Sequence, residues 1–298
     1  MKVLCYGSLN IDITYRVNHI VKEGETISSY SVFKGAGGKG ANQSAALAKA
    51  GLRVFHSGKL GTDGAFILDK LKSFGVDTSL TIVTDNQSGN AIIQVDDKGQ
   101  NSIILFSGEN KNILKTEVDS VLSNFDAGDW LVIQNEINEL EYIINRASEK
   151  GINICFNPAP MDEDVFKLPL DKITLLVVNE IEGAALALTD GDFEEILNTL
   201  CQKYPKCKIL MTLGDKGSLY YDGSKVYHQA CFKVDSVDTT AAGDTFIGYF
   251  LKKLIEKEDA IAALKWASAA SAIAVSRKGA MDSVPYYDEV RSFLGESI

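Results

Sequence analysis

The chain has 298 residues, 45% of them hydrophobic and 23% charged, which is typical of a globular protein that can form one sizeable core. Acidic residues outnumber basic ones by 40 to 30, and the net charge of −10 argues against nucleic-acid or anionic-membrane binding, since both need a basic surface. The five cysteines lack the paired spacings of a zinc site, and no segment is apolar enough for a signal or a membrane span, so we expect a cytoplasmic protein.

The first predicted strand, residues 3–7, leads into the stretch "GSLNID". Asn10 and Asp12 lie two positions apart there, so their side chains fall on the same side of an extended backbone. Asp12 can accept two hydrogen bonds from hydroxyl groups, and Asn10 can both donate and accept. The end of such a strand is a ligand crevice in open α/β sheets, although an Asx turn that merely closes the strand is the alternative.

Residues 11–34 and 89–107 differ from the rest of the chain because they are rich in strand-forming residues. The second stretch is typical of a hairpin that turns at "DDKGQN". We predict that both insertions form a small antiparallel sheet, set apart from the core as a lid, within a single domain that spans residues 1–298. An exposed sheet edge tends to pair with another sheet, so we expect a homodimer formed through two lids.

The glycine cluster "GAGGKGANQ", which begins at Gly35, fits the GxGxxG pattern literally. A dinucleotide fingerprint follows directly after the first strand of a βαβ unit, whereas about 25 lid residues intervene here, and no Walker A sequence occurs. We therefore interpret the cluster as flexible backbone that opens a helix at about Ala41. Its backbone donors, with the ammonium of Lys39 and the amide of Asn42, suit a small polyhydroxylated ligand.

Continuous apolar runs of strand length lie at 3–7, 130–134, 153–157, 175–179 and 209–213. Because these runs are continuous rather than alternating, they predict strands buried on both faces of a parallel sheet. Helical patterns such as 139–150 and 192–203 lie between them. This alternation predicts the α/β fold class, as a three-layer α/β/α sandwich with a central, mostly parallel sheet.

Polar residues follow two of the later strands. "VVNEIEG" (177–183) places Asn179 and Glu182 three residues apart on one helix face, where an amide and a carboxylate can hold hydrated Mg²⁺ and a phosphate oxygen. Helix capping by ordinary surface acids is the alternative. "TLGDKG" (212–217) is either a simple strand-to-strand turn or a loop whose backbone lies against a nucleotide.

The stretch "DTTAAGDTF" (238–246) combines small residues with one carboxylate. The amides of Ala241, Ala242 and Gly243 can point at a ligand, and a helix that begins near Asp244 adds positive partial charge, so together they form an anion hole for phosphate. Asp244 could be an ordinary N-cap, but a cap does not require Ala-Ala-Gly before it, whereas a base beside a phosphate does. The alanine- and serine-rich helix at 260–275 predicts close packing against a neighbouring helix.

These stretches, together with "NPAP" (157–160) and "SRKGAMDSVP" (276–285), occur in the order and spacing of the ribokinase-like (PfkB) sugar kinases. The resemblance extends from residue 1 to about 295, and "GGKGANQ" and "SRKGA" are most similar to the ribokinase branch of that family. It implies transfer of the ATP γ-phosphate to a sugar hydroxyl, with D-ribose converted to ribose 5-phosphate. Such a reaction needs positioning and charge stabilisation more than covalent chemistry.

The resemblance also implies a role for each residue that matches a family motif. Asp244 would be the base, and the amides of Ala241, Ala242 and Gly243 would form the anion hole. The sugar would contact Asn10, Asp12, Gly38, Lys39, Gly40, Ala41, Asn42, Glu136 and Asp244. ATP would lie along Asn179, Thr212, Gly214, Asp215, Gly217, Gly243 and Ser268, with Glu182 organising Mg²⁺ through water.

Kinases of this kind carry a monovalent cation beside the anion hole, so the resemblance implies K⁺ here as well. Its ligands, largely backbone carbonyls, would be Asp238, Thr240, Ala274, Arg277, Gly279 and Ser283. The chain departs from the pattern at Ser268, where a ribokinase of this family carries a histidine. A serine fills less volume there and stacks on nothing, which affects the packing of adenine.

Other functions fit parts of the same pattern. Within the family, the acceptor could instead be fructose, a deoxypentose, another sugar, a nucleoside or a sugar phosphate, and Lys39 does not discriminate among them. A sugar phosphate would need an extra cationic pocket, whereas the lysines and arginine of the lid are scattered. A catalytically silent sugar- or nucleotide-binding protein would have lost the base or the anion hole, and both are present in this sequence.

Overall fold

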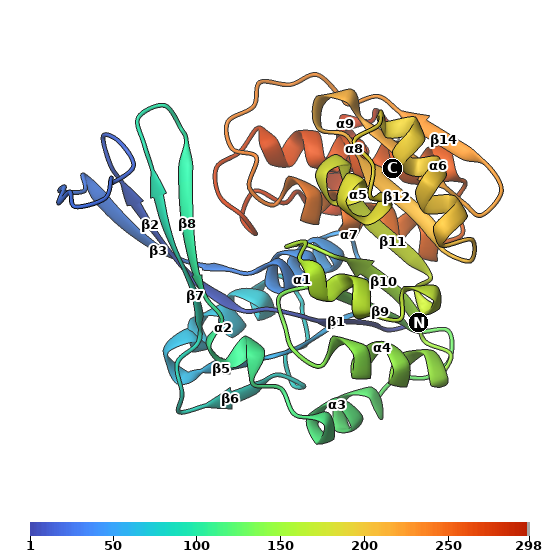
Figure 1. The fold of residues 1–298 in the computed structure, drawn as a ribbon, viewed down its shortest axis with the longest axis horizontal. Coiled ribbons are helices and arrows are strands. Elements are labelled where there is room, and N and C mark those ends of the chain that lie inside the picture. The colour runs from blue at the N-terminus through green and yellow to red at the C-terminus, as the bar shows by residue number, and fades with distance from the viewer. Residues whose placement is uncertain (297–298) are drawn as a thin grey trace.

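A computed structural model describes residues 1–296 of the chain (Figure 1). Its strands are β1 (Val3–Tyr6), β2 (Asn10–Arg16), β3 (Ser31–Gly37), β4 (Val54–Ser57), β5 (Lys59–Gly61), β6 (Ile82–Thr84), β7 (Gly89–Val95), β8 (Asn101–Phe106), β9 (Trp130–Gln134), β10 (Asn153–Asn157), β11 (Leu175–Asn179), β12 (Lys208–Thr212), β13 (Ser218–Tyr221) and β14 (Val226–Gln229). Its α-helices are α1 (Lys39–Lys49), α2 (Ala65–Ser73), α3 (Lys115–Leu122), α4 (Leu140–Glu149), α5 (Glu180–Ala187), α6 (Phe193–Lys203), α7 (Ala242–Ile255), α8 (Ala260–Val275) and α9 (Tyr287–Phe293). Two short 3-10 helices near the site are η2 (Gly108–Lys111) and η5 (Gly214–Lys216).

The main sheet has eight strands in the order β14-β13-β12-β11-β10-β9-β1-β4. The strands from β12 to β4 run parallel, and β13 and β14 add an antiparallel edge. The predicted parallel sheet and its core strands are therefore confirmed. The apolar pattern does not predict β4, because "VFHS" ends in two polar residues. His56 is nevertheless fully buried, since Ser44 Oγ lies 2.7 Å from its Nδ1.

Helices cover both faces of the main sheet, and each face has its own hydrophobic core. On one face, α1, α2, α7 and α8 pack against inward-pointing strand residues such as Cys5, Val132 and Leu210. On the other, α3, α4, α5 and α6 pack against the alternate residues of the same strands, such as Ile133 and Phe156. Continuous apolar strands are explained by this arrangement, because every side chain of a central strand enters one core or the other.

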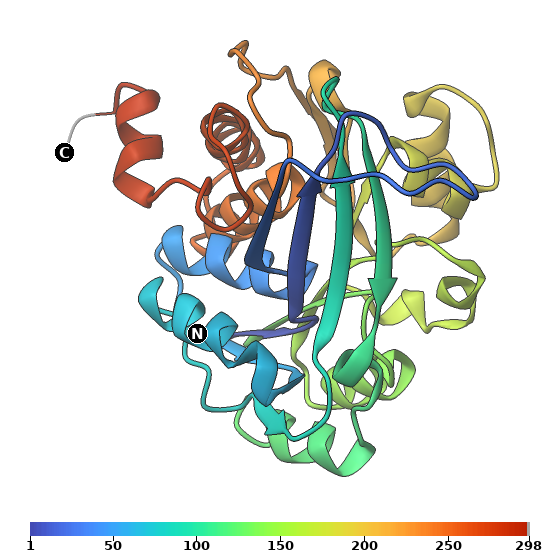
Figure 2. The ribbon, with the colours of Figure 1, turned by 90° about the vertical axis from the view of Figure 1, so that its left-hand side faces the viewer.

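A second sheet, of four strands in the order β3-β2-β7-β8, projects from the main body and stands in front of it in Figure 2. Its β7–β8 turn lies at the predicted "DDKGQN", where Asp96 Oδ1 accepts the Lys98 and Gln100 amides, each at 2.9 Å. The prediction of a purely antiparallel sheet is wrong, because β2 pairs with β7 in parallel. The chain between these strands passes through α1 and α2 and so re-enters the small sheet from the end at which β2 begins.

Two helices begin earlier than their sequences suggest. The first helix of the chain, α1, begins at Lys39 rather than near Ala41, and α7 begins at Ala242 rather than near Asp244. In both, the preceding N-cap residue has a positive φ, of 96° at Gly38 and 60° at Ala241. This left-handed backbone turns the chain directly into the helix, so that no further residues are needed to complete the turn.

Close packing aligns α1, α7 and α8. A Cβ at Gly248 of α7 would lie 2.7 Å from the Ala46 Cβ of α1, so the two helices are in backbone contact there. Helix α8 packs along α7, as its small residues predict. The N-termini of α1 and α7 thus point at one region. None of the helices within residues 1–296 is long and apolar enough to cross a membrane.

Candidate active site

Polar residues gather at one edge of the main sheet, where the parallel strands end. The residues that end or follow these strands are Asn10 and Asp12 (β1), Glu136 (β9), Asn157 (β10), Asn179 (β11) and Thr212 (β12). Ligands of open α/β sheets bind at this carboxyl edge. The N-termini of α1 and α7 face the same place and supply positive partial charge.

Asn10 is held in one orientation by a residue that no motif contains. Its Oδ1 accepts from Asn110 Nδ2 at 2.7 Å, and Asn110 is fixed in turn by the backbone of Leu9, with Oδ1 accepting at 3.0 Å and Nδ2 donating at 3.3 Å. Because its oxygen is engaged, Asn10 presents its amide donor to a ligand. A Cβ at Gly89 would lie 2.2 Å from Asn110 Nδ2, so only glycine fits beside this pair.

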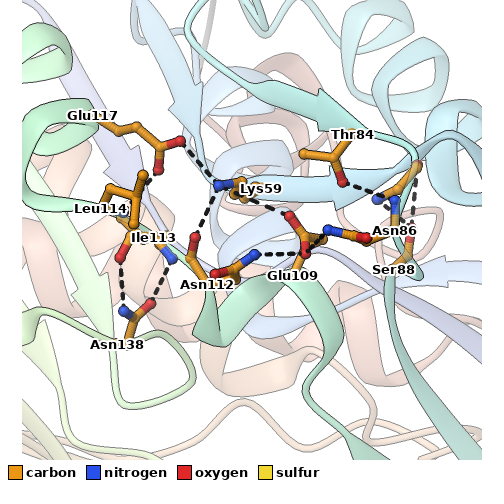
Figure 3. A network of polar contacts seen from close by, with 11 residues as sticks. Lys59, Thr84, Asn86, Ser88, Glu109, Asn112, Ile113, Leu114, Glu117 and Asn138 are labelled. Carbon is orange, nitrogen blue, oxygen red and sulfur yellow. Dashed lines mark hydrogen bonds and ion pairs between the residues drawn. The ribbon is translucent and has the colours of Figure 1, made fainter.

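The segment that carries Asn110 is anchored by a buried ion-pair network (Figure 3). Lys59 Nζ lies 2.9 Å from Glu117 Oε1 and 3.9 Å from Glu109 Oε2, and it donates to the Asn112 carbonyl at 2.9 Å. Glu109 Oε1 accepts from two asparagine side chains, at 2.9 and 3.0 Å. Since Glu109 immediately precedes Asn110, the network fixes the position of η2 and thereby of the start of β2.

The glycine cluster forms a tight turn into α1. A Cβ at Gly40 would lie 2.4 Å from the Ser8 amide nitrogen, so the turn lies directly on the backbone that follows β1. Ser8 Oγ accepts the Gly40 amide at 3.2 Å and donates to Glu136 Oε2. The Lys39 amide donates to the same carboxylate oxygen at 3.1 Å. The turn therefore holds Glu136, which follows β9, against the end of β1.

Asp12 is a carboxylate with free acceptor capacity. Burial, and next the nearby Glu136 carboxylate, raise the pKa of Asp12 to about 7. Within residues 1–296 its side chain makes no hydrogen bond, whereas Glu136 accepts from Ser8 and from the Lys39 amide. A Cβ at Gly37, on the neighbouring strand, would lie 2.0 Å from Asp12 Oδ2. The site keeps space around this carboxylate.

The ammonium of Lys39 lies among carboxylates. Burial acts to lower its pKa, but Asp244, Glu136 and Glu182 together raise it above its ordinary value. No ion pair or side-chain hydrogen bond of this ammonium occurs in the described part of the chain. Lys39 is therefore a cation at the centre of the site that is available to an anionic ligand.

Asp244 lies in the first turn of α7, half-buried, and accepts hydrogen bonds from two side chains of α1. Asn42 Nδ2 donates to its Oδ2 at 3.2 Å, and Gln43 Nε2 donates to its Oδ1 at 2.9 Å. Burial raises the pKa of Asp244, although Lys39, Gln43 and Asn42 oppose the rise. The alternative that Asp244 is the N-cap is wrong, because the cap is Ala241.

Asn42 has an acceptor that the protein leaves unsatisfied. Its Oδ1 is buried and has no hydrogen-bond partner within residues 1–296, while its Nδ2 is bound to Asp244. A buried polar atom without a partner costs about 1–3 kcal/mol, so such an atom at a site is best explained by a ligand that donates to it. A ligand hydroxyl next to Asp244 would do so.

The turn before α7 presents free backbone donors. The Ala242 amide donates to the Thr239 carbonyl at 3.2 Å, but for the amides of Ala241, Gly243 and Asp244 we find no acceptor among residues 1–296. A Cβ at Gly243 would meet no atom within 4 Å. Free amides at a helix N-terminus bind anions. Of the three amides predicted to form an anion hole, those of Ala241 and Gly243 are thus free in this structure.

Asn179 and Glu182 form a capping box at the start of α5. The Glu182 amide donates to Asn179 Oδ1 at 2.8 Å, and the Asn179 amide donates to Glu182 Oε2 at 3.0 Å. Burial raises the pKa of Glu182, whereas the Asn179 amide and Lys39 lower it. Asn157 Nδ2 approaches the same carboxylate at 3.4 Å. The capping role named as an alternative is confirmed, and the carboxylate also lies close enough to interact with Lys39.

The predicted nucleotide loop connects β12 to the antiparallel strand β13 through η5. Ser268 Oγ of α8 donates to the Ala230 carbonyl at 3.4 Å. The thiol of Cys231, which follows Ala230, donates to the Asp215 carbonyl of η5 at 2.8 Å. The segment 230–231 thus joins η5 to α8. The predicted residues at this junction are Thr212, Gly214, Asp215, Gly217 and Ser268.

Three of the predicted cation ligands are in contact where the segment before α7 touches the segment after α8. Asp238 accepts from the Thr240 amide at 2.9 Å and from the Gly279 amide at 3.0 Å. Burial acts to raise the pKa of Asp238, but these hydrogen bonds hold it below its ordinary value. The guanidinium of Arg277 pairs with Glu289 at 2.7 Å, so its charge is committed elsewhere. Asp238, Thr240 and Gly279 are thus in contact, and the full predicted set, which also includes Ala274, Arg277 and Ser283, stays a prediction.

Four polar residues of the site are absent from the sequence-based assignment: Ser8, Gln43, Asn110 and Asn157. Gln43 ends the motif "GGKGANQ" and Asn157 opens "NPAP", so their motifs mark their neighbourhood but not their roles. Asn110 lies in no motif. Its contact with Asn10 joins residues 100 positions apart, and no local sequence signal could have found it.

Comparisons with known proteins show the family and the fold of this chain. The model of the pfkB family carbohydrate kinases matches residues 1–286. The ribokinase of Bacillus subtilis (strain 168) is 35% identical over 301 residues, which cover 99% of this chain and 100% of that protein. The deoxyribokinase of Salmonella typhi is 30% identical and covers 99% of each chain. The structure of the Arabidopsis thaliana ribokinase complexed with ribose and ATP superimposes with a TM-score of 0.86, at 30% identity, over 99% of each chain.

Proposed function

Since this chain belongs to the pfkB family of carbohydrate kinases and is thus an ATP-dependent sugar kinase, we propose that its acceptor is D-ribose and its product ribose 5-phosphate. The single observation that carries the mechanism is the position of Asp244 between free backbone amides and the unpartnered oxygen of Asn42. A carboxylate there can meet both a hydroxyl and a phosphate. The similar Arabidopsis thaliana ribokinase, solved with ribose and ATP, supports the choice of sugar.

The sugar would bind at the ends of β1 and α1. Asn10 donates through its free amide group, Asp12 accepts from hydroxyls, and Asn42 Oδ1 accepts from a further hydroxyl. Glu136 holds the glycine turn through Ser8 and through the Lys39 amide. The backbone of Gly38, Gly40 and Ala41 completes the wall of the pocket. The small sheet would act as the lid that excludes water.

Phosphoryl transfer would then proceed between Asp244 and the anion hole. Asp244 accepts the proton of the sugar hydroxyl as its oxygen forms a bond to the γ-phosphorus. The bond from that phosphorus to the bridging oxygen of ATP breaks, and ADP leaves. The free amides of Ala241 and Gly243, with the Lys39 ammonium, stabilise the negative charge of the transferring group.

The nucleotide would extend from the anion hole along β11, η5 and α8. We assign its contacts to Asn179, Thr212, Gly214, Asp215, Gly217, Gly243 and Ser268. The segment 230–231, which joins η5 to α8, supports a shared wall for adenine. Because Ser268 donates to a backbone carbonyl and offers no ring, adenine would be held by shape and backbone contacts.

The oxygen donors near the anion hole fit two metal ions. The described residues contain no cluster of three or more metal-binding His, Cys, Asp or Glu side chains, so Mg²⁺ would be held through water and phosphate oxygens near Glu182. Asp238, ionised at neutral pH, and the carbonyls around it suit K⁺, a larger cation. Bound there, these ions would neutralise phosphate charge and support the turn before α7.

Deoxyribose is the second candidate acceptor, because the deoxyribokinase of Salmonella typhi is 30% identical over 99% of this chain. The two sugars differ by one hydroxyl. A site built to bind that hydroxyl loses about 1–3 kcal/mol when it is missing, which is roughly a 5- to 150-fold preference. Acceptor preference therefore separates the two assignments.

We expect D-ribose to be phosphorylated with the highest kcat/KM in a panel of pentoses, hexoses, nucleosides and sugar phosphates. The assay measures ADP release with each acceptor, in K⁺ and in Na⁺ buffers. The rate with ribose should be lower in Na⁺, because the smaller ion would fit the proposed cation site at Asp238 poorly. A higher kcat/KM for another compound would make that compound the acceptor in place of ribose. Equal rates in both salts would contradict the proposed K⁺ site.

Sugar binding should weaken as the pH falls through about 7, the raised pKa of Asp12. Protonation replaces an acceptor lone pair with a donor, so the KM for ribose should rise below that pH while the KM for ATP changes less. Folding favours the protonated form of Asp12, so its contribution to stability falls as the pH rises from about 4 to 7. Asp12→Asn should therefore bind ribose weakly at every pH but melt at a higher temperature at pH 8. A ribose KM that is constant from pH 5.5 to 8.5 would contradict this role.

We also propose that two small sheets pair in a homodimer. Val32, Ile92, Ile104 and Phe106 point away from the face that carries Asp12, and they are 60, 38, 61 and 50% exposed. The same face has an open groove of about 360 Å³ beside Tyr15. We expect a dimer mass by light scattering at micromolar concentration and a monomer after Ile104→Lys. A monomer mass for the parent protein would refute the proposal.

A cytoplasmic location fits the chemistry of the chain. All five cysteines are free thiols in the structure, as expected in a reducing compartment. A catalytically silent binding protein is disfavoured, because Asp244 and the free amides of the α7 turn are both in place.

A further inference from the structure

Gln43 connects Asp244 to the interior of the protein. It lies on α1 and is fully buried, as is Gln134 at the end of β9. Gln43 Nε2 donates to Asp244 Oδ1 at 2.9 Å, and Gln43 Oε1 accepts from Gln134 Nε2 at 2.6 Å. Because both amides are sealed from water, neither can exchange its partner for solvent.

The direction of this chain of hydrogen bonds is set by its outer end, because the ionised carboxylate of Asp244 can only accept. Gln134 Nε2 also contacts Cys5 Sγ at 3.7 Å, and the Cys5 thiol donates to the Gly40 carbonyl at 3.3 Å. Burial raises the pKa of the Cys5 thiol to about 11, so it remains a donor at neutral pH. If the amide of Gln43 were flipped, its oxygen would face a carboxylate oxygen and its nitrogen would face another NH₂ group. Gln43 must therefore present its donor to Asp244.

We infer that Gln43 is a positioning residue for phosphoryl transfer: its amide fixes Oδ1 of Asp244, so that the carboxylate offers its remaining lone pairs to the acceptor hydroxyl. Asn42 cannot replace it, because Asn42 lies on the ligand side and has an oxygen to satisfy there. Both amide atoms of Gln43 are bound within the protein, to Asp244 and to Gln134, so its orientation does not depend on a ligand. The inference rests on the proposed role of Asp244 as the base.

The same amide extends toward the nucleotide side of the site. Gln43 Nε2 lies 3.5 Å from Asn157 Oδ1, and Asn157 Nδ2 lies 3.4 Å from Glu182 Oε2. Asn157 is anchored by a hydrogen bond of 3.1 Å to the Val177 carbonyl. The base and the carboxylate proposed to organise Mg²⁺ are thus joined through two buried amides.

The effect of Gln43 should be measurable through the pKa of Asp244. The charged or titratable groups that face Asp244 are Lys39 of α1, Glu182 of α5 and the Cys5 thiol of β1. Burial raises the pKa of Asp244, and the hydrogen bond from Gln43 opposes that rise. Without the donor, the base would be protonated at a higher pH.

The test compares pH profiles of kcat/KM, from pH 5 to 9, for the parent enzyme and Gln43→Leu. We expect the acidic limb to move up by about one pH unit and kcat at pH 7 to fall about 10-fold or more, with both KM values within about threefold. Asn138→Ala, which removes a structural amide bound to Ile113, is the matched control and should leave the acidic limb unchanged. An unshifted limb with kcat within twofold of the parent would overturn the inference.

A second pair of variants covers the case in which Gln43→Leu does not fold. Gln43→Glu should lower the melting temperature, because it places two carboxylates against each other, and adding Asp244→Asn should recover most of that loss, because the double variant again pairs one donor with one acceptor across the contact. Additive changes would show that the contact is absent in solution and would overturn the inference. Asp244→Asn measured alone separates the role of the base from the role of Gln43. If Asp244→Asn retains turnover, Asp244 is not the base. If Asp244→Asn is inactive but Gln43→Leu leaves the acidic limb unshifted, only the role inferred for Gln43 is wrong.

Discussion

Replacing Asp244 by asparagine should lower kcat by about 10²- to 10⁴-fold, the range over which a general base contributes, and leave ribose binding within about threefold. The base acts mainly in the transition state, so the loss should appear in kcat rather than in the dissociation constant of the sugar. The new side chain fits the site. Gln43 can still donate to its oxygen, and Asn42 can rotate so that its unpartnered Oδ1 accepts the new NH₂.

Stability should not fall with this substitution. Burial raises the pKa of Asp244, so its ionised form opposes folding at neutral pH and the amide removes that cost. Asp69→Asn, at an exposed carboxylate of α2, is the control and should keep kcat within about twofold. Single-turnover rates and sugar binding by calorimetry separate the two effects. Turnover by Asp244→Asn within a few-fold of the parent would show that the base is another residue.

Changing Gly243 to aspartate should separate stability from activity. A Cβ at Gly243 meets no atom within 4 Å, so the fold accepts the side chain. Replacing a helical glycine should raise the free energy of unfolding by about 0.5–1 kcal/mol. An acidic residue in the first turn of a helix should raise it by about 0.3–1 kcal/mol more. The melting temperature should stay constant or rise. The same charge would occupy the anion hole and repel the phosphate, so kcat/KM for ATP should fall by about 10²-fold or more.

Two variants on the same helix serve as controls for Gly243→Asp. Gly243→Ala should share its stability and lose less activity, because it adds volume without charge. Gly248→Ala should lower the melting temperature, because its Cβ would lie 2.7 Å from the Ala46 Cβ. If Gly243→Asp kept kcat/KM for ATP within about threefold of the parent, the turn before α7 would not be the phosphate site.

The main sheet could be predicted from the sequence because its signal is local. Strands β9, β10 and β11 are uninterrupted apolar runs, and a buried parallel strand needs nothing else. The parallel pairing of β2 with β7 could not be predicted, because residues 17–88 lie between them and the path of that segment decides the direction. Strand β4 was hidden by His56, whose burial depends on Ser44 of another element.

The residues of the candidate site also fall into two groups, those that a local motif predicts and those that depend on distant partners. Asp244, Lys39 and Asn42 were predictable because their motifs include glycines or alanines that specify a backbone shape. The partners that orient them were not: the bond from Gln43 to Asp244 spans 201 positions. The motif around Glu182 allowed either Mg²⁺ binding or helix capping, and the structure shows the capping role directly.

The sequence by itself determined the buried strands at the centre of the main sheet, the positions of the glycine turn and of the turn before α7, and the type of reaction. These features depend on residues within a few positions of one another, and a short segment is enough to specify them. Only the tertiary structure decided which way each buried amide points, which carboxylate remains unpaired and which backbone donors remain free. Those properties depend on partners far apart in the chain, since a hydrogen bond is directional and its partner is known only once the helices and strands have packed.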